Sequence, residues 1–352
     1  MVYKKNRVAT CILCIGVLAA GCTQNTPKYI SPESSNAPIE AIKQQPVGAS
    51  TPIPFGDMTI PGLREKTYNS SLQNLQTISE SADYTSYLTN YSSEGLKINA
   101  LITQPKGEKP PGGWPAIVFV HGYIPPNLYR TTEKYVEYVN YLASNGFVVL
   151  KIDLRGHGSS EGEAGSGYYS SDYVLDTLNA YTALENVDFV DKNKIGLWGH
   201  SMAGNILLRT FAVKPEIPAV VIWAGAGFTY QDLRDYRIND NSYQAQPSDS
   251  PSQRRRQELF NTHGQFDPHK DFWKQVTPSN YLTDLRGAIQ LNHAVDDNVV
   301  SINYSRNLNN LLDATSVVHE LKEYPSGGHN INGSSFTQAL QNTIEFYRKH
   351  LQ

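Results

Sequence analysis

Short apolar runs follow one another from residue 116 onward and alternate with segments of helical periodicity. The apolar runs occupy residues 116–120, 148–152, 195–198, 219–223, 289–291 and 317–321. Between the runs, apolar side chains recur every three or four positions, at Tyr135, Val139 and Leu142, at Val174, Leu178 and Tyr181, and at Phe336, Leu340, Ile344 and Tyr347. Because short buried strands that alternate with helices form a parallel sheet covered on both faces, the pattern predicts an α/β fold with a mostly parallel, doubly wound sheet.

A hairpin is predicted just before this alternating region. Residues 84–91 and 96–104 are strand-like, and the Ser-Ser-Glu-Gly segment at 92–95 is typical of a turn. The hairpin would add antiparallel strands to one edge of the sheet. We therefore predict a domain over residues 83–352, whereas residues 62–82 fit either a short helix or a lead-in that packs on the domain.

Residues 225–281 interrupt the alternation of strands and helices. They are polar and aromatic, with Tyr230, Tyr243 and Trp273 among them. A connection this long inside a compact domain is usually functional, so we predict that it forms a lid over a functional site. The arginines at 254–256 fit a solvated face better than a binding site for an anionic substrate.

The N-terminus has the layout of an export signal. Basic residues at Lys4, Lys5 and Arg7 precede an apolar stretch at 8–20, which is too short to span a bilayer comfortably. The following Gly-Cys resembles a bacterial lipoprotein signal and implies cleavage of residues 1–21 with lipidation of Cys22. We expect a protein anchored to a membrane of the cell envelope, on its extracytoplasmic side; an ordinary signal peptide or an uncleaved anchor are the alternatives.

Composition agrees with export and with an acidic mature protein. Loss of the three basic signal residues would change the formal net charge from −3 to −6, which argues against a nucleic-acid partner. Cys22 would be the only cysteine left, so no internal disulfide is expected. Residues 22–82 are predicted to be a tether and lead-in. The stretch to about residue 61 is rich in Pro and Ser and has no apolar periodicity, which is typical of an extended tether.

Ser201 is the candidate nucleophile. It stands in Gly199-His200-Ser201-Met202-Ala203, between an apolar strand and a helix predicted over 202–211. A Gly-x-Ser-x-Gly turn of this kind presents the serine at the top of an α/β-hydrolase sheet and needs small neighbours where strand and helix pass. Ala203 departs from that pattern by one methyl group, so we expect the turn to survive with more crowding.

Candidate partners for the serine follow in the order Asp, then His. Asp296 lies in an acidic loop after the apolar run at 289–291, and His329 lies in a Gly-rich loop after a later strand. A serine needs a base to take its proton and a third group to orient the base. The alternatives are a surface turn for the acidic loop and a simple loop imidazole for His329.

The oxyanion hole requires backbone N–H groups beside the serine. We assign one donor to Met202, which follows the nucleophile. The second is assigned to Tyr123, in the turn after residues 116–120.

Five motifs together resemble the catalytic domain of the prolyl oligopeptidase (S9) family and related exported esterases and acyl hydrolases. They are His121-Gly122-Tyr123, Asp153-Leu154-Arg155-Gly156-His157-Gly158, Gly199-His200-Ser201-Met202-Ala203-Gly204, Asp296-Asp297-Asn298 and Gly328-His329. The resemblance covers residues 83–352 and implies the α/β-hydrolase fold. It selects Asp296 rather than Asp297 for the triad and assigns substrate contact to Asn298. The chain has no room for the β-propeller of the larger peptidases, which leaves esterase activity open.

These features predict a membrane-anchored serine hydrolase that cleaves ester or peptide bonds through Ser201, His329 and Asp296. The alternatives are a carboxylesterase acting on small esters and a non-catalytic lipoprotein that binds a ligand. No cofactor is expected, and His263 and His269 lack the neighbours of a zinc site. We expect His157 to be structural and His200 to support the turn around the serine.

Overall fold

The computed structural model describes residues 54–243 and 249–352, and within them one mixed sheet carries the fold. Its strands are β1 (Gln73–Glu80), β2 (Tyr84–Ser93), β3 (Leu96–Pro105), β4 (Trp114–Val120), β5 (Val148–Ile152), β6 (Val190–His200), β7 (Ala219–Trp223), β8 (Ala288–Ala294) and β9 (His319–Tyr324). The order across the sheet is β1-β2-β3-β5-β4-β6-β7-β8-β9. All neighbouring pairs from β5 to β9 are parallel, whereas β1, β2 and β3 are antiparallel, which confirms the predicted doubly wound sheet with an antiparallel edge.

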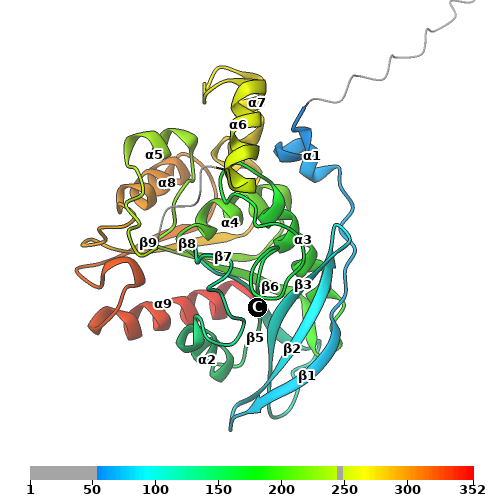
Figure 1. Ribbon diagram of the computed structural model, residues 1–352. Coiled ribbons are helices and arrows are strands. Elements are labelled where there is room, and N and C mark those ends of the chain that lie inside the picture. Colours follow the sequence, from blue (N-terminus) through cyan, green and yellow to red (C-terminus); the bar gives the residue numbers. More distant parts are fainter. Residues whose placement is uncertain (1–53, 244–248) are drawn as a thin grey trace, which may run out of the picture. The chain divides into compact units, whose positions relative to one another are not determined.

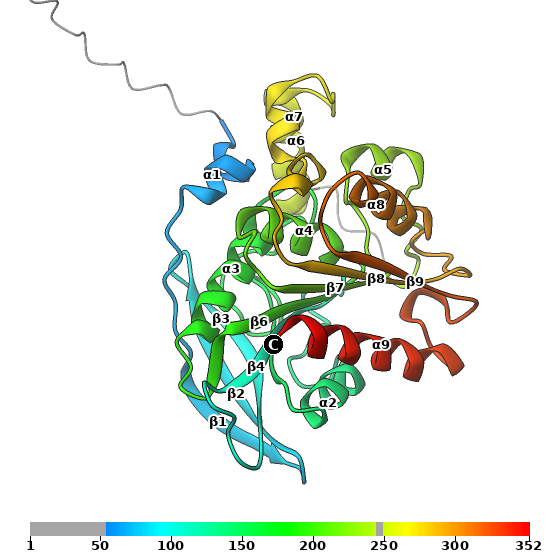
Figure 2. The same cartoon turned by 180° about the vertical axis from the view of Figure 1, so that it is seen from behind.

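Helices cover both faces of this sheet, as the views in Figures 1 and 2 show. The helices α2 (Val136–Ser144) and α9 (Ser334–His350) pack on one face, and α3 (Asp172–Glu185), α4 (Ala203–Val213) and α8 (Asn303–Asp313) pack on the other. Alternate side chains of β4 enter the two cores: Ile117 and Phe119 face α2 and α9, and Val118 faces α3 and α4. Burial on both faces explains why the strand is a continuous apolar run.

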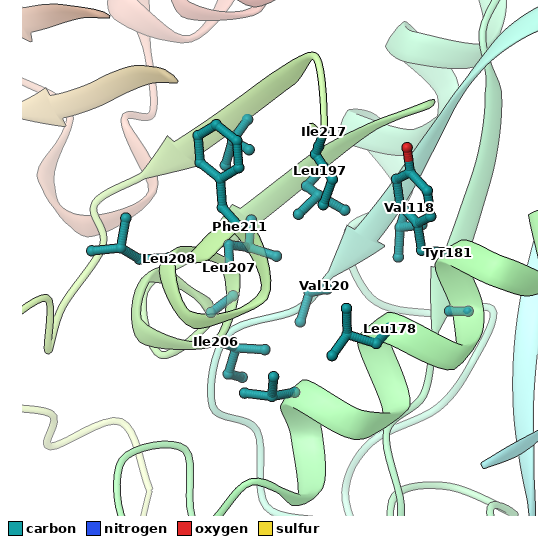
Figure 3. Close-up of a cluster of buried hydrophobic side chains, with 14 of the residues drawn as sticks. Val118, Val120, Leu178, Tyr181, Leu197, Ile206, Leu207, Leu208, Phe211 and Ile217 are labelled. Carbon is teal, nitrogen blue, oxygen red and sulfur yellow. The ribbon is translucent and has the colours of Figure 1, made fainter. Parts of the chain in front are cut away.

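The core on the α3–α4 side lies directly beneath the serine turn. Figure 3 shows Ile206, Leu207 and Phe211 of α4 together with Leu178 of α3 and Val118 of β4. All five side chains are buried. The helix that follows the candidate nucleophile is therefore anchored in apolar packing, which fixes where its first turn lies.

The predicted hairpin is observed, and the folded unit also includes residues that precede the predicted start at residue 83. The folded unit already includes the 3-10 turn η1 (Gly56–Met58), the helix α1 (Ile60–Arg64) and the strand β1. Ile60 and Leu63 are buried in the main core. The strand β1 escapes pattern analysis because all its residues are exposed at a sheet edge, so it carries no apolar alternation.

The described residues of the segment from 225 to 281, called the cap here, include several short helices. It contains α5 (Tyr230–Asp235), α6 (Pro251–His263), α7 (Asp271–Val276) and the start of η2 (Pro278–Asp284). Its own small core holds Leu259 and Trp273, together with Met58 from the N-terminal segment. The predicted lid is therefore a folded element with its own packing.

The predicted signal, the anchor at Cys22 and most of the predicted tether lie outside the described residues. Among the residues that are described, no helix combines the length and apolar character needed to cross a membrane.

Candidate active site

Ser201 lies at the turn between β6 and α4, where the sequence placed it. Its backbone has a φ of 57°, a left-handed conformation that is rare for residues other than glycine. The turn is held by hydrogen bonds from the Ser201 N–H to the Trp223 carbonyl, at 2.9 Å, and from the Ala226 N–H to the Ser201 carbonyl, at 3.1 Å. A strained serine held by its surroundings in this way is typical of a nucleophile site.

Ala203, which departs from the motif, leaves no space for a side chain at Gly199. A Cβ placed on Gly199 would lie 2.7 Å from the Cβ of Ala203 and 2.7 Å from a methyl carbon of Leu207. Both neighbours are fully buried. The extra methyl of Ala203 fits because the facing position on the strand carries no side chain.

We expect Gly199→Ala to destabilise the fold by about 1–3 kcal/mol, the usual cost of overpacking a core. Denaturant unfolding measures the loss. The double variant Gly199→Ala/Ala203→Gly should recover part of it, because the closest contact would be relieved. Equal stability of the wild type and Gly199→Ala would contradict the close packing.

His329 lies in the short turn η3 (Gly328–Asn330) after β9 and contacts the serine. Its Nε2 is 2.9 Å from the Oγ of Ser201 and its Nδ1 is 2.8 Å from the Oδ2 of Asp297. The imidazole of His329 is half-buried and lies between Ser201 and Asp297. The structure thus brings a hydroxyl, a base and a carboxylate into one hydrogen-bonded line.

Asp297 is firmly held in this arrangement. Its Oδ1 accepts hydrogen bonds from the N–H groups of Val299 and Val300, at 2.8 and 3.0 Å. Its Oδ2 also lies 3.2 Å from the Nε2 of buried His293. Burial alone would raise the pKa of Asp297, but the hydrogen bonds of His293 and His329 hold it well below its usual range. The carboxylate is therefore ionised and fixed in orientation.

The sequence-based choice of Asp296 as the partner of His329 is wrong in this structure. Asp296 is exposed, and its carboxylate accepts hydrogen bonds from the N–H groups of Gly328, at 2.8 Å, and Gly327, at 3.3 Å. The chain turns after β8, so the two adjacent carboxylates point in different directions and only Asp297 reaches the imidazole. Asn298 is also exposed and lies outside the linings of both cavities described below.

His200 connects the base to the oxyanion turn. Its Nε2 is 2.9 Å from the carbonyl of His329, and its Nδ1 is 2.9 Å from the hydroxyl of Tyr135. That hydroxyl in turn accepts the Gly122 N–H at 2.9 Å. Burial lowers the pKa of His200 to about 3, so its ring is neutral.

These partners fix the direction of each proton. The carbonyl of His329 can only accept, so the Nε2 of His200 carries the hydrogen and its Nδ1 accepts the Tyr135 O–H. The ring thus joins the loop of the base to the turn that bears Tyr123. This agrees with the expected supporting role of His200.

We expect Tyr135→Phe to lower kcat about tenfold, because the Gly122 N–H loses its acceptor and the His200 ring loses its donor. A tenfold loss in kcat corresponds to about 1.4 kcal/mol less stabilisation of the transition state. The KM should change little, since the ring remains. Steady-state hydrolysis of an ester measures both constants. The matched control is Tyr141→Phe, which alters a half-buried tyrosine of α2 that lies outside both cavities. An unchanged kcat would show that the chain of hydrogen bonds does not position the site.

Two cavities meet at Ser201. One, of about 310 Å³, also contains His329, and the other, of about 280 Å³, also contains Met202. Tyr123 and Asp240 line both cavities. The two residues assigned as oxyanion donors, Tyr123 and Met202, therefore line the same cavity as the serine. An acyl group and a leaving group would each have a space of small-molecule size.

The cap contributes directly to these cavities. Asp240 and Tyr243 line the cavity beside His329, and the ring of Tyr243 meets that of Tyr123 edge-on at 5.9 Å. Sequence reasoning placed the cap over the site but singled out no cap residue as a ligand contact. The sequence signal that could have identified Asp240 is an acidic residue between the aromatic residues Tyr236 and Tyr243 in a long insertion.

The remaining histidine candidates lie in ring-packing contacts. His157 is buried, with a pKa lowered to about 4 by burial, and its ring packs against Tyr173. His263 stacks on Phe272 at 3.6 Å. No group of His, Cys, Asp and Glu side chains in residues 54–243 and 249–352 is arranged to hold a metal ion.

The predicted solvated face at 254–256 is only partly right. Arg255 forms ion pairs with Asp172 and Asp57, at 3.4 and 3.7 Å. The guanidinium of Arg256 lies over the ring of Tyr169. These arginines attach the cap to the body of the protein.

Two known families match overlapping parts of the chain. The family described as "Serine aminopeptidase, S33" matches residues 115–239, and the family described as "BAAT / Acyl-CoA thioester hydrolase C terminal" matches residues 178–351. The first match contains Ser201 and the second contains all three hydrogen-bonded residues. Both match the region where the parallel strands lie.

The curated relatives include peptidases, and the similar solved structures include peptidases and esterases. A probable dipeptidyl-aminopeptidase B from Aspergillus terreus is 23% identical over 69% of this chain, which spans only 25% of that relative. Acetyl xylan esterase 1 from Thermoanaerobacterium sp. superposes with a TM-score of 0.57 at 20% identity, over 83% of this chain and 93% of the esterase. A puromycin-hydrolysing peptidase from Mycobacterium tuberculosis gives a TM-score of 0.58 at 18% identity, over 77% of this chain and 40% of the peptidase.

Proposed function

We propose that the chain is a serine hydrolase of the α/β-hydrolase type, which the family matches and the structural neighbours support, and that it cleaves carboxylic esters through an acyl-enzyme on Ser201. The observation that carries this proposal is the continuous hydrogen-bonded line from Ser201 through His329 to Asp297. It is the arrangement that acyl transfer by a serine requires. The acid in this proposal is Asp297, in place of the predicted Asp296.

The reaction follows from the contacts. The Nε2 of His329 takes the proton from the Oγ of Ser201 as the oxygen attacks the substrate carbonyl. The N–H groups of Tyr123 and Met202 stabilise the oxyanion. His329 then gives its proton to the departing alcohol, and a water molecule releases the acid by the same steps. Throughout, Asp297 holds the Nδ1–H of the imidazole and stabilises its charged form.

Peptide or amide cleavage is the second candidate, and Asp240 favours it. Among the described residues, it is the one carboxylate that lines the two cavities at Ser201. A carboxylate there could pair with the ammonium group of an aminoacyl substrate. The serine aminopeptidase match and the dipeptidyl-aminopeptidase relatives agree with this reading.

A matched panel of substrates separates the two candidates. Purified protein is assayed on p-nitrophenyl acetate and butyrate and, in parallel, on alanyl and alanyl-prolyl p-nitroanilides. Faster turnover of the esters, with little effect of Asp240→Asn, supports an esterase. Faster turnover of the anilides, with a raised KM in Asp240→Asn, replaces the ester proposal with an aminopeptidase.

We further propose that the enzyme is held at the membrane of the cell envelope by a lipid on Cys22. Support comes from the basic start, the short apolar stretch and the small residues before the cysteine. Multiple acyl chains would give stable anchoring. Mass spectrometry of the mature N-terminus should find acylated Cys22, and Cys22→Ala should leave the membrane fraction; an unmodified or uncleaved N-terminus would refute the anchor.

A further inference from the structure

A cavity of about 700 Å³ lies on the cap, apart from the two cavities at Ser201. It opens between α5, α7, η2 and α8, and none of its lining residues lines the other two. We call it the outer cavity. Its size is within the range of small-molecule sites, so its lining indicates what it can bind.

Aromatic rings form part of its wall. Tyr236, Phe266, Trp273 and Tyr281 all contribute. Trp273 is fully buried, and Phe266 packs edge-on against it at 5.8 Å. Tyr236 and Tyr281 are half-buried. Tyr236 packs edge-on against Tyr304 at 5.4 Å, and the guanidinium of Arg64 lies over the ring of Tyr281 at 5.2 Å, so both rings are held in place. Such rings offer fixed flat surfaces against which a ligand's apolar face can pack.

Asp232 supplies a hydrogen-bond acceptor in the same cavity. It is 2% exposed, and its Oδ1 accepts the side-chain amide of Asn307 at 2.7 Å. Its Oδ2 is buried, and no donor among the described residues reaches it in hydrogen-bonding geometry. Burial raises the pKa of Asp232 to about 6, although Thr229 and Asn307 act against the rise. A buried acceptor without a donor favours a ligand that brings an O–H or N–H group.

The other polar groups indicate a neutral ligand. The carboxylates of Asp232 and Asp235 disfavour anions, and Asp235 is already bonded to the amide of Gln231 at 2.9 and 3.0 Å. Lys274 on the same wall, which is itself paired with Asp271 at 3.6 Å, offsets one of the two carboxylates. The remaining lining is rich in uncharged amide and hydroxyl side chains, which donate and accept equally well.

From the rings, the buried acceptor and the uncharged amides together, we propose that the outer cavity binds a neutral polyhydroxylated ligand, a short saccharide. The apolar face of a sugar ring would pack on Tyr236 and Tyr281, and a hydroxyl would donate to the carboxylate of Asp232 once that side chain turns toward the cavity. The binding does not depend on acyl transfer by Ser201. One cap segment contributes to all three cavities. Its residues up to Tyr236 line the outer cavity, and Asp240 lines both cavities at Ser201.

The test is isothermal titration calorimetry on the full-length Ser201→Ala protein, which binds without turnover. The ligands are xylotetraose, cellotetraose and, as a cation, choline. We expect saturable binding of at least one oligosaccharide, weakened about tenfold by Tyr281→Ala, by Tyr236→Ala and by Asp232→Ala. The matched control is Tyr87→Ala, which removes a half-buried tyrosine on β2, away from the cavity, and should bind normally.

The outcomes separate this site from the reaction. With Ser201 present, Tyr281→Ala should keep the wild-type rate on p-nitrophenyl acetate, which also shows that the variant folds. Binding lost in Tyr281→Ala but kept in Tyr87→Ala supports the saccharide site, whatever the result on esters. No heat with either oligosaccharide at the highest soluble concentration, binding unaffected by all three cavity variants, or binding of choline alone would overturn it.

Discussion

Ser201→Ala is expected to lower the rate of ester hydrolysis by about 10⁴-fold or more, the loss seen when a serine hydrolase loses its nucleophile. The hydroxyl 2.9 Å from His329 is the one group in this line able to form the acyl-enzyme. The change removes a single oxygen at the junction of two cavities, so the fold should persist. The residual rate would come from binding and from the backbone donors of Tyr123 and Met202.

A fluorophosphonate probe gives an independent readout, because it reacts with an activated serine whatever the natural substrate. Labelled wild-type protein and unlabelled Ser201→Ala, with equal melting temperatures, are the expected pair. Label that persists in Ser201→Ala would place the nucleophile elsewhere. A folded wild-type protein that takes no label would remove the basis of the proposed reaction.

The second large effect is expected from one of two adjacent carboxylates. Asp297→Asn should lower kcat by about 10⁴-fold, because an amide facing the imidazole favours the wrong tautomer. Asp296→Asn should change kcat by less than about threefold, since the amide oxygen can still accept the Gly328 N–H. The two variants remove the same charge at neighbouring positions, so they control for each other.

Initial rates on one ester, with melting temperatures for both proteins, decide between the carboxylates. A large loss in Asp296→Asn with a near-normal Asp297→Asn would show that the assignment from the sequence motif was right and that the contact with His329 is not functional. Equal small losses would mean that neither carboxylate orients the base.

The central part of the fold could be predicted because its signals are local. A run such as residues 148–152, buried on both faces, is apolar throughout, and the strand observed there has the same bounds. The serine turn is likewise a short motif whose strand and helix flank it directly. The edge strand β1 could not be predicted, because exposed residues at a sheet edge need no apolar pattern.

The acid of the site shows where local reasoning stops. Asp296 and Asp297 are equivalent in type and adjacent in sequence, and a family resemblance selected the first. The choice depends on how the chain turns after β8 and on donors at Val299, Val300 and His293, which fix the carboxylate of Asp297.

The α/β sheet, the serine turn, the candidate base and the long insertion could all be predicted from the sequence, because each prediction rests on side chains within a few residues of one another. Three features follow only from the folded chain: the carboxylate that contacts the base, the hydrogen bonds by which His200 connects the base to the oxyanion turn, and the cap residues that line the cavities. Those contacts join positions as distant as Ser201 and His329, and such pairs are set by packing of the whole domain.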